Sequence, residues 1–389
     1  MKTLIELYDD RPIENVLSTE MFRPEETIFL CPPELAAGQN FKQNIERYFA
    51  HRQCPARISI VSVSLLDSGK VEKQLCKILE CHPDCAIDIA GGTEASLFAV
   101  GKACGDTPVF TFSRKRNSYF EISNAPFARN LPCEIQLDTE SCFLMAGGKL
   151  LPGRGDNAEL RNRLEQIDRL FSVFCRWRSI WRRQITYFQK ISSSETGQLE
   201  ANGPHTVSVD RKSVTVEKKL LDDLAQQGLI LDLSITDELV HFRFPDETVR
   251  FWLRDIGAVL ELQVFRACLA AEIFNDVTLS AIVNWEGSAS QRNTITNEID
   301  VVAIRGLWPV FISCKTSEIH TEALNELAIM RNRFGGHGSR AIIVTSANAT
   351  KSRPLMRRRA AEMNIEVIEW DDLPTNKLIE RLRNMIVSH

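Results

Sequence analysis

Short apolar or β-branched runs alternate with longer amphipathic stretches over residues 1–125 of the chain. The apolar runs are expected strands, at residues 3–8, 27–31, 57–64, 85–90, 108–112 and 119–122. The amphipathic stretches are expected helices, near residues 34–51, 68–81 and 93–104. A strand that is apolar throughout is typical of a sheet covered by helices on both faces. The pattern therefore predicts an open, mostly parallel α/β sheet, which binds ligands beyond the carboxyl ends of its strands.

Two loops of this expected sheet carry residues suited to a phosphorylated ligand. Asp10-Arg11 follows the first strand, and Gly91-Gly92-Thr93-Glu94 follows the fourth strand at the start of a helix. Glycine allows a close approach of the backbone, and a helix N-terminus presents free N–H groups. Thr93 is equally suited to be an ordinary N-cap. The motifs GxxxxGK[ST] and GxGxxG do not occur, which disfavours an NTPase or an ordinary dinucleotide enzyme.

Residues 151–248 are expected to form a helical and winged-helix-like connector. Apolar side chains recur at three- and four-residue steps through residues 157–190, which predicts a long amphipathic helix or a helix pair. Eight basic and three acidic residues make this stretch a candidate nucleic-acid track. Trp177 and Trp181 could stack on bases, but their helical spacing favours the core side or a dimer seam. A small polar linker at 192–204, a helix at 213–227 and a hairpin of strands at 229–235 and 239–244 are expected to follow.

Residues 249–389 predict a second α/β unit. Its expected elements are a helix at 249–274, strands at 279–285, 298–304 and 308–314, a helix at 321–334, a strand at 340–345, a basic helix at 353–363 and a strand at 366–370. The second and third strands meet at a glycine, so we expect them to form a hairpin.

Charged side chains gather on this expected hairpin. Glu298 and Asp300 share one face of the first strand, and Ser313 and Lys315 share one face of the second. Carboxylates hold hard divalent cations, which stabilise charge on a phosphodiester and generate hydroxide from water. A lysine beside them can orient that water. Glu261, near the centre of the preceding helix, could complete the site, although an ordinary surface position fits it equally well.

This order of a helix glutamate, a strand aspartate and a strand lysine resembles the PD-(D/E)xK restriction-endonuclease-like nucleases. The run NEIDVVAIRGLWPVFISCKT, followed by a helix and Gly335-Gly336, resembles the C-terminal domain of CRISPR-associated ancillary nucleases. The N-terminal domain of that family is a CARF (CRISPR-associated Rossmann fold) domain. The family has Glu or Asp two residues before the lysine, where this chain has Ser313. Glu261 or Glu298 would then have to supply the missing charge.

The resemblance implies a fold with three parts: a Rossmann-like CARF domain at residues 1–150, the connector, and a restriction-endonuclease-like α/β domain at 249–389. It also implies a homodimer that binds a cyclic oligoadenylate, with cyclic tetra-adenylate as the expected activator. The implied ligand contacts are Asp10, Arg11, Gly91, Gly92, Thr93, Glu94 and Arg114. In the family a lysine typically stands where this chain has Glu94, and the basic run at 113–117 could compensate for that carboxylate.

The activity that the resemblance implies is metal-dependent cleavage of single-stranded RNA, DNA or both in type III CRISPR antiviral defence. Asp300 and Glu261 would hold Mn²⁺ or Mg²⁺. The implied catalytic residues are Asp300, Lys315, Glu261, Glu298 and Ser313. The alternative is a non-catalytic nucleotide sensor that binds nucleic acid through a degenerate nuclease domain, and Ser313 is the residue that favours it.

Composition limits where such a protein can act. A net charge of −4 over 389 residues excludes a globally basic coat, so any polyanion site must be local. No apolar run approaches the length of about 18 residues that a membrane span requires. The 11 cysteines include no CxxC pair, which indicates reduced thiols in a cytoplasmic protein.

Overall fold

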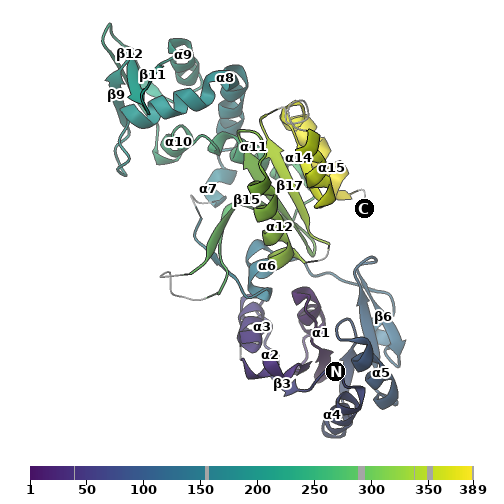
Figure 1. Cartoon of the computed structure of the whole chain (residues 1–389). Helices are drawn as coiled ribbons and strands as arrows, with labels where there is room; N and C mark the ends of the chain where they lie inside the picture. The colour runs from purple at the N-terminus through teal and green to yellow at the C-terminus, as the bar shows by residue number, and fades with distance from the viewer. Residues whose placement is uncertain (39, 154–156, 288–293, 337, 348–353, 388–389) are drawn as a thin grey trace.

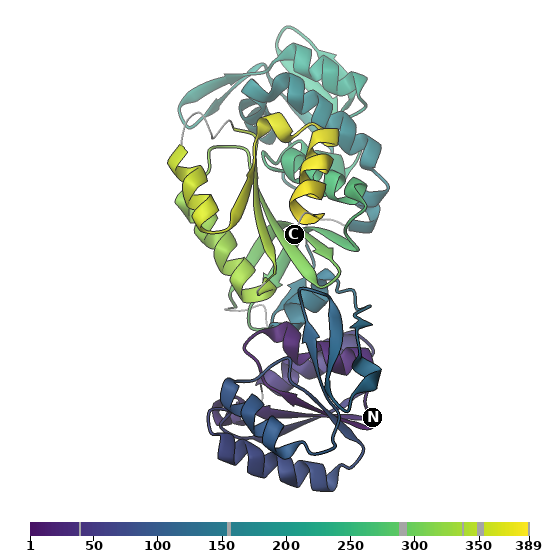
Figure 2. The same cartoon turned by 90° about the vertical axis from the view of Figure 1, so that its right-hand side faces the viewer.

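The computed structural model describes residues 1–38, 40–153, 157–287, 294–336, 338–347 and 354–387. Two α/β domains lie one above the other, and a connector of helices and short strands packs beside the second domain (Figures 1 and 2). The N-terminus lies in the first domain and the C-terminus in the second (Figure 1). The expected mixed α/β fold is confirmed.

The first domain is built on a seven-stranded sheet with the order β3-β2-β1-β4-β5-β6-β7. The sheet is parallel from β3 to β5, and β6 and β7 are antiparallel. Chain order reverses between β1 and β4, which are neighbours, so the loops after these two strands lie at a topological switch point. The strands are β1 (Thr3–Leu7), β2 (Glu26–Cys31), β3 (Arg57–Ser62), β4 (Cys85–Asp88), β5 (Val109–Ser113), β6 (Ser118–Ser123) and β7 (Leu131–Pro132).

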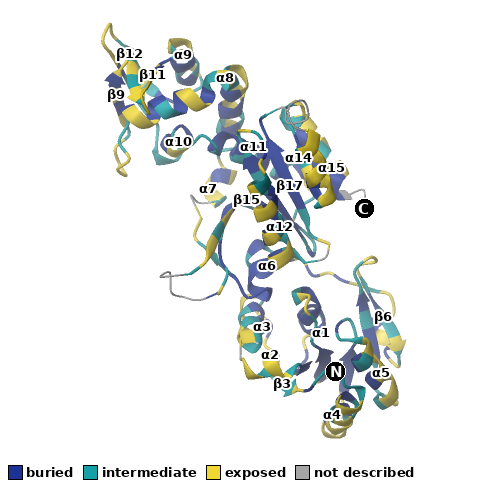
Figure 3. Cartoon of the chain, in the orientation of Figure 1, coloured by how far each residue is buried: buried dark blue, intermediate teal, exposed yellow. Residues whose placement is uncertain are grey.

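Helices cover both faces of this sheet, and its central strands β2, β1 and β4 are buried along their whole length (Figure 3). The expected helix at 34–51 is two helices, because the first ends at Gly38. The six-residue α1 was not predicted, since so short a helix has little periodicity. The helices are α1 (Leu17–Phe22), α2 (Pro33–Ala37), α3 (Asn40–His51), α4 (Ser68–Cys81) and α5 (Glu94–Ala103), with 3₁₀ turns η1 (Pro12–Asn15) and η2 (Pro126–Ala128).

The connector contains the predicted helix pair and hairpin, with two corrections. Part of the expected linker is a strand, β9, that pairs with β13 and buries Ala201 and Gly203. The first residues of the expected helix at 213–227 form β11, where a β-branched Val214 is buried. The elements are α7 (Asn157–Arg161), α8 (Leu164–Ile191), β9 (Glu200–Pro204), β10 (Thr206–Val209), β11 (Lys212–Thr215), α9 (Lys218–Gln226), β12 (Leu231–Ile235), β13 (Leu239–Arg243) and α10 (Glu247–Trp252).

The second domain has a six-stranded sheet with the order β18-β17-β16-β15-β14-β8. Strands β14, β15 and β16 form an antiparallel meander, and β17 and β18 add in parallel. Its edge strand, β8, directly follows the first domain in the chain. One continuous segment therefore joins that domain to this sheet. The strands are β8 (Lys149–Leu151), β14 (Asp276–Asn284), β15 (Thr296–Arg305), β16 (Trp308–Lys315), β17 (Arg340–Thr345) and β18 (Ile365–Ile368).

Helix α11 packs against one face of this sheet together with α8 and α15, whereas α12 lies on the other face. The expected helix at 249–274 is broken, because Asp255 accepts a hydrogen bond from the Gly257 N–H at 2.8 Å and forms a turn between α10 and α11. Arg353, the expected start of the basic helix, lies outside the described residues. The remaining elements are α6 (Thr139–Met145), α11 (Ala258–Ala271), α12 (Thr321–Met330), η3 (Arg331–Gly335), α14 (Pro354–Glu362), η4 (Trp370–Asp372) and α15 (Thr375–Val387).

Each of the 11 cysteines is a free thiol, and seven of them are buried. Their expected role as small core residues is therefore confirmed for most of them. Within the described ranges, no helix has the length and apolar character that crossing a membrane requires.

Candidate functional sites

The strands of the second domain change face next to Asp300. Leu279 and Val301 pack in the core cluster that contains α11, whereas Ala281 and Ile299 belong to the cluster on the opposite face. A two-residue step along a strand normally keeps one face. Ser280, between Leu279 and Ala281, has a left-handed φ of 53°. Because of this local twist, the orientation of the Asp300 side chain cannot be predicted from simple alternation along the strand.

Asp300 is held at the centre of the site by β16. Its Oδ2 atom accepts hydrogen bonds from the Cys314 N–H at 2.6 Å and from the Ser313 Oγ at 3.2 Å. Lys315 Nζ lies 3.7 Å from the same oxygen. The hairpin thus brings three predicted catalytic residues together. Burial raises the pKa of Asp300, and Lys315 opposes that shift.

Glu261 faces this cluster from the first turns of α11. Burial, and then the nearby charge of Asp300, raise the pKa of Glu261 to about 8. Asp255 and Glu298 add to the shift, and Lys315 opposes it. Two half-buried carboxylates, each with a raised pKa, are an arrangement that a hard cation with oxygen ligands relieves. Asp300 and Glu261, the two predicted metal ligands, therefore fit the expected Mn²⁺ or Mg²⁺.

Glu298 lies at the edge of this cluster. It is exposed, and its Oε1 accepts a hydrogen bond from Ser280 Oγ at 2.5 Å. In the part of the chain that the structure describes, no three His, Cys, Asp or Glu side chains converge to form a complete metal site. Two carboxylates, a lysine and the strand backbone are consequently the donors available for phosphodiester chemistry at this end of the sheet.

The predicted ligand-binding loops of the first domain meet at the switch point between β1 and β4. A Cβ atom at Gly91 would lie 2.5 Å from the Leu7 backbone oxygen, and Gly92 has φ +94°. Both glycines therefore permit the close contact of the two loops. Arg11 forms a bidentate ion pair with Asp9 at 2.6 and 2.8 Å, and it also reaches the Ala90 carbonyl at 3.4 Å.

Helix α5 begins beside these loops. Thr93 is its N-cap, with the Ser96 side chain completing a capping box. The Thr93 hydroxyl also donates to the Leu65 carbonyl at 2.5 Å, which ties a third loop to the site. Glu94 and Asp10 are exposed. The structural role expected for Thr93 is thus present, at the same edge as the other predicted ligand contacts.

Arg114 does not face Glu94. Its guanidinium is paired with the buried carboxylate of Glu14, which accepts from the Arg114 Nε at 2.5 Å. Arg114 of the basic run is thus engaged by Glu14, and compensation of Glu94 by the run at 113–117 stays a prediction. Burial raises the pKa of Glu14, while Arg114 opposes the shift.

Two further carboxylates lie inside the sheet beneath these loops, and sequence reasoning missed them. Asp88 and Glu6 are 3% and 2% exposed, on the neighbouring strands β4 and β1. Burial raises the pKa of Asp88 to about 7, and burial and Asp88 together raise the pKa of Glu6. Ser18 and Thr19 of α1 donate hydrogen bonds to Asp88 and Glu6, respectively. An acidic residue inside an otherwise apolar strand was the available sequence signal.

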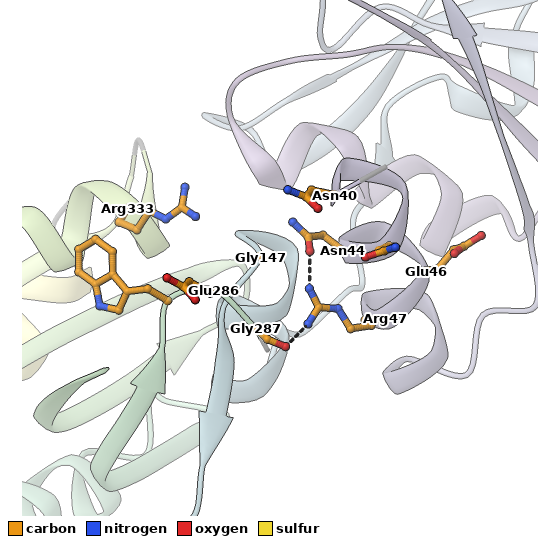
Figure 4. A pocket seen from close by; sticks show the side chains of 10 residues that line it. Asn40, Asn44, Glu46, Arg47, Gly147, Glu286, Gly287 and Arg333 are labelled. Atoms are coloured by element: carbon orange, nitrogen blue, oxygen red, sulfur yellow. Dashed lines mark hydrogen bonds between the residues drawn. The ribbon is translucent and has the colours of Figure 1, made fainter. Parts of the chain in front are cut away.

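A cavity of about 810 Å³ lies between the two domains (Figure 4). Asn44 and Arg47 of α3 line one side, and Trp285, Glu286 and Gly287 line the other. Arg47 donates a hydrogen bond to the Gly287 carbonyl at 2.6 Å and another to the Asn44 side chain (Figure 4). This link was not predictable from the sequence, because Arg47 and Gly287 are 240 positions apart.

Comparisons with known proteins agree with this geometry. Residues 246–387 match the family described as "Card1-like, endonuclease domain". Protein VC1899 from Vibrio cholerae has a TM-score of 0.75 and 16% identity, over 99% of this chain and 98% of its own. Can2 from Sulfobacillus thermosulfidooxidans, solved in complex with cyclic tetra-adenylate, has a TM-score of 0.70 and 17% identity, over 99% of this chain and 97% of its own.

A type III CRISPR defence DNA nuclease activated by cyclic oligoadenylate aligns with 88% of this chain and 45% of its own length, with a TM-score of 0.48 and 14% identity. A search of curated proteins finds no match. The family match of residues 246–387 confirms the expected nuclease resemblance of the C-terminal region. The chain shares its fold with VC1899 and Can2 over almost its whole length, and the match of residues 246–387 to a Card1-like endonuclease domain identifies a nuclease.

Proposed function

We propose that this nuclease is activated by a cyclic oligoadenylate, depends on a divalent metal and cleaves single-stranded RNA, DNA or both in type III CRISPR defence. The observation that carries the proposal is the cluster of Asp300, Lys315 and Glu261 at one end of the Card1-like domain. Mn²⁺ or Mg²⁺, held by Asp300 and Glu261, would supply Lewis-acid stabilisation of phosphodiester charge. Lys315 would orient the attacking water, and Ser313 would hold Asp300 in place.

The activator site is proposed at the switch point of the first domain. Gly91, Gly92 and the α5 N-terminus offer backbone N–H groups to phosphate, and Arg11 offers a cation. Can2, which has the same fold, was solved with cyclic tetra-adenylate, so this ring is the proposed activator.

We propose a homodimer in which two copies share this activator. Phe98 of α5 is 64% exposed and Leu66, in the loop that Thr93 contacts, is 79% exposed. Such apolar exposure beside the site is typical of an interaction surface. The free thiols support a reducing compartment, and we propose the cytoplasm.

The test is cleavage of labelled single-stranded RNA, single-stranded DNA and plasmid by the full chain. Each substrate is incubated with Mn²⁺, Mg²⁺ or EDTA, in the presence and absence of cyclic tetra-adenylate. We expect metal-dependent cleavage that the activator increases. Asp300→Ala and Lys315→Ala should each reduce the rate at least about 100-fold, or about 2.7 kcal/mol.

Glu322→Ala, an exposed carboxylate in the first turn of α12, is the matched control and should retain the wild-type rate. Binding of nucleic acid without cleavage under every condition would replace this proposal with the non-catalytic sensor that Ser313 favours. Cleavage that survives both alanine substitutions would overturn the assignment of the site.

A further inference from the structure

A second pocket, of about 390 Å³, lies where the connector meets the nuclease domain. Arg178, Ser179 and Arg182 of α8 line one side of it. Ile256, Thr316 and Ser346 line the other side. The pocket therefore joins a helix outside the endonuclease match to three loops of the endonuclease domain itself.

These three loops also border the catalytic cluster. Thr316 directly follows Lys315, whose carbonyl accepts a hydrogen bond from the Ser346 N–H at 3.1 Å. Ile256 precedes Gly257, at which a Cβ atom would lie 2.7 Å from Glu261 Oε1. One lining residue, Thr316, is thus next to the catalytic lysine in the sequence. Another, Ile256, lies in the turn that precedes the helix of Glu261.

Two arginines of α8 and its N-cap residue, Arg163, have internal partners, which separates them from a ligand. Arg176 forms a bidentate ion pair with Asp223 at 2.7 and 2.8 Å. Arg163 pairs with Asp246 at 2.7 Å. Arg178 donates to the Ser346 carbonyl at 2.9 Å and lies 3.9 Å above the Trp370 ring, so it is fixed in the wall of the pocket.

Arg182 differs from these residues. It is exposed, and its guanidinium has no ion pair or hydrogen bond to any of the residues that the structure describes. The described lining of the pocket contains two arginines, hydroxyl groups and no carboxylate. Such a lining suits a phosphate diester, which accepts charge-assisted hydrogen bonds from arginine and further ones from hydroxyls.

We propose that this pocket binds a backbone phosphate of the nucleic-acid substrate next to the scissile one, with Arg182 as the cation that contacts it. Arg178 forms the fixed wall, and Ser179 and Thr316 supply hydroxyl groups. The inference rests on the proposed nuclease function and extends it, because it makes the connector part of the substrate site. The nucleic-acid strand then passes from α8 across the end of β16 that carries Lys315.

The test measures binding of labelled single-stranded RNA and DNA oligonucleotides to the full chain, in an Asp300→Ala background that prevents cleavage. Arg182→Ala should weaken binding about tenfold and lower the slope of log affinity against log salt by about 0.7. Arg182→Lys should recover part of the affinity. Arg183→Ala, an equally exposed neighbour on α8 that does not line the pocket, should change affinity less than twofold.

Kinetics in the otherwise unchanged chain give a second measurement. Arg182→Ala should raise KM with little change in kcat, since the contact serves binding and the chemistry lies elsewhere. Equal effects of Arg182→Ala and Arg183→Ala, or no effect of either, would overturn the proposal while wild-type cleavage leaves the nuclease function intact. Selective loss of binding in Arg182→Ala, without cleavage by the wild type, would support the pocket and contradict the nuclease function.

Discussion

In the proposed site, Glu261 is the residue that would make Ser313 compatible with a nuclease. The strand position two residues before Lys315 carries a neutral hydroxyl, which donates to Asp300 instead of binding a cation. Glu261 brings a carboxylate to the same cluster from α11, where burial and Asp300 raise its pKa to about 8. A carboxylate can reach a catalytic centre from either element, because a metal requires convergence in space and not a fixed order in sequence.

Glu261→Gln should therefore abolish most of the activity. The amide keeps the size of the side chain but removes a metal ligand, so kcat should fall at least about 100-fold and half-saturation should require more Mn²⁺. Glu298→Gln should change the rate less than about threefold, since Glu298 is exposed at the edge of the cluster. Metal titrations of both variants with an activated, labelled substrate check this difference.

The control for Glu261→Gln places a carboxylate at a different position of the same site. Ser313→Glu, combined with Glu261→Gln, should recover at least about tenfold of the lost rate, because the side chain of residue 313 already contacts Asp300. A combined variant no better than Glu261→Gln alone would mean that the role of Glu261 depends on its place in α11.

At the scale of the elements, the strands of both sheets were predictable and their fine geometry was not. The apolar runs of β1, β2 and β4 predict strands because both faces are buried. The change of face at Ser280 has no such signal, since serine rarely adopts a left-handed φ and only tertiary packing selects it. The sequence pattern therefore placed Asp300, Ser313 and Lys315 close together, and their catalytic role stays a prediction, whereas the orientation of Asp300 required the structure.

The buried carboxyl group of Asp88 should lower the stability of the first domain as pH rises. Its folded-state pKa is about 7, above the ordinary 3.8, so the folded chain keeps a proton that the unfolded chain has released. Stability from this group is present below about pH 4 and is lost as pH rises to 7. Asp88→Asn should therefore melt at least roughly 4 °C higher than the wild type at pH 8.

That difference should shrink as pH falls toward 4 and vanish below it, where Asp88 becomes protonated in both states. Asp84→Asn, an exposed position just before β4, is the matched control and should show no such trend. Thermal melts followed by circular dichroism across this pH range provide the measurement. A constant difference at every pH would show that the substitution acts through packing and not through the proton.

At the scale of the whole molecule, the net charge conceals how the basic residues are used. The connector helix α8 looks like a continuous basic track in the sequence, yet Arg176 and Arg163 bind Asp223 and Asp246 within the fold. Trp177 donates to Asp223 and Trp181 is buried, as expected of core residues. Only a structure separates arginines that hold the connector together from those left for a ligand.

The two domains also need a physical link if an activator bound to one is to change the rate of the other. Arg47 provides such a link across the polar cavity between them, through its hydrogen bond to the Gly287 carbonyl at the end of the β14 hairpin strand (Figure 4). Strand β14 pairs with β15, which carries Asp300. A movement of α3 can therefore reach the catalytic hairpin through one side chain and two strands, a contiguous path of the kind that coupling requires.

Arg47→Ala should accordingly reduce the stimulation by cyclic tetra-adenylate at least about fivefold, or about 1 kcal/mol of coupling free energy. The rate without activator and the affinity for the activator should stay within about twofold, because Arg47 contacts neither proposed site. Lys42→Ala is the matched control, since Lys42 lies on the same helix and pairs only with Glu46 among the described residues. Activator titrations with a labelled substrate check the prediction. If Arg47→Ala and Lys42→Ala give the same stimulation as the wild type, coupling runs through another contact, such as the packing of α3 on α6.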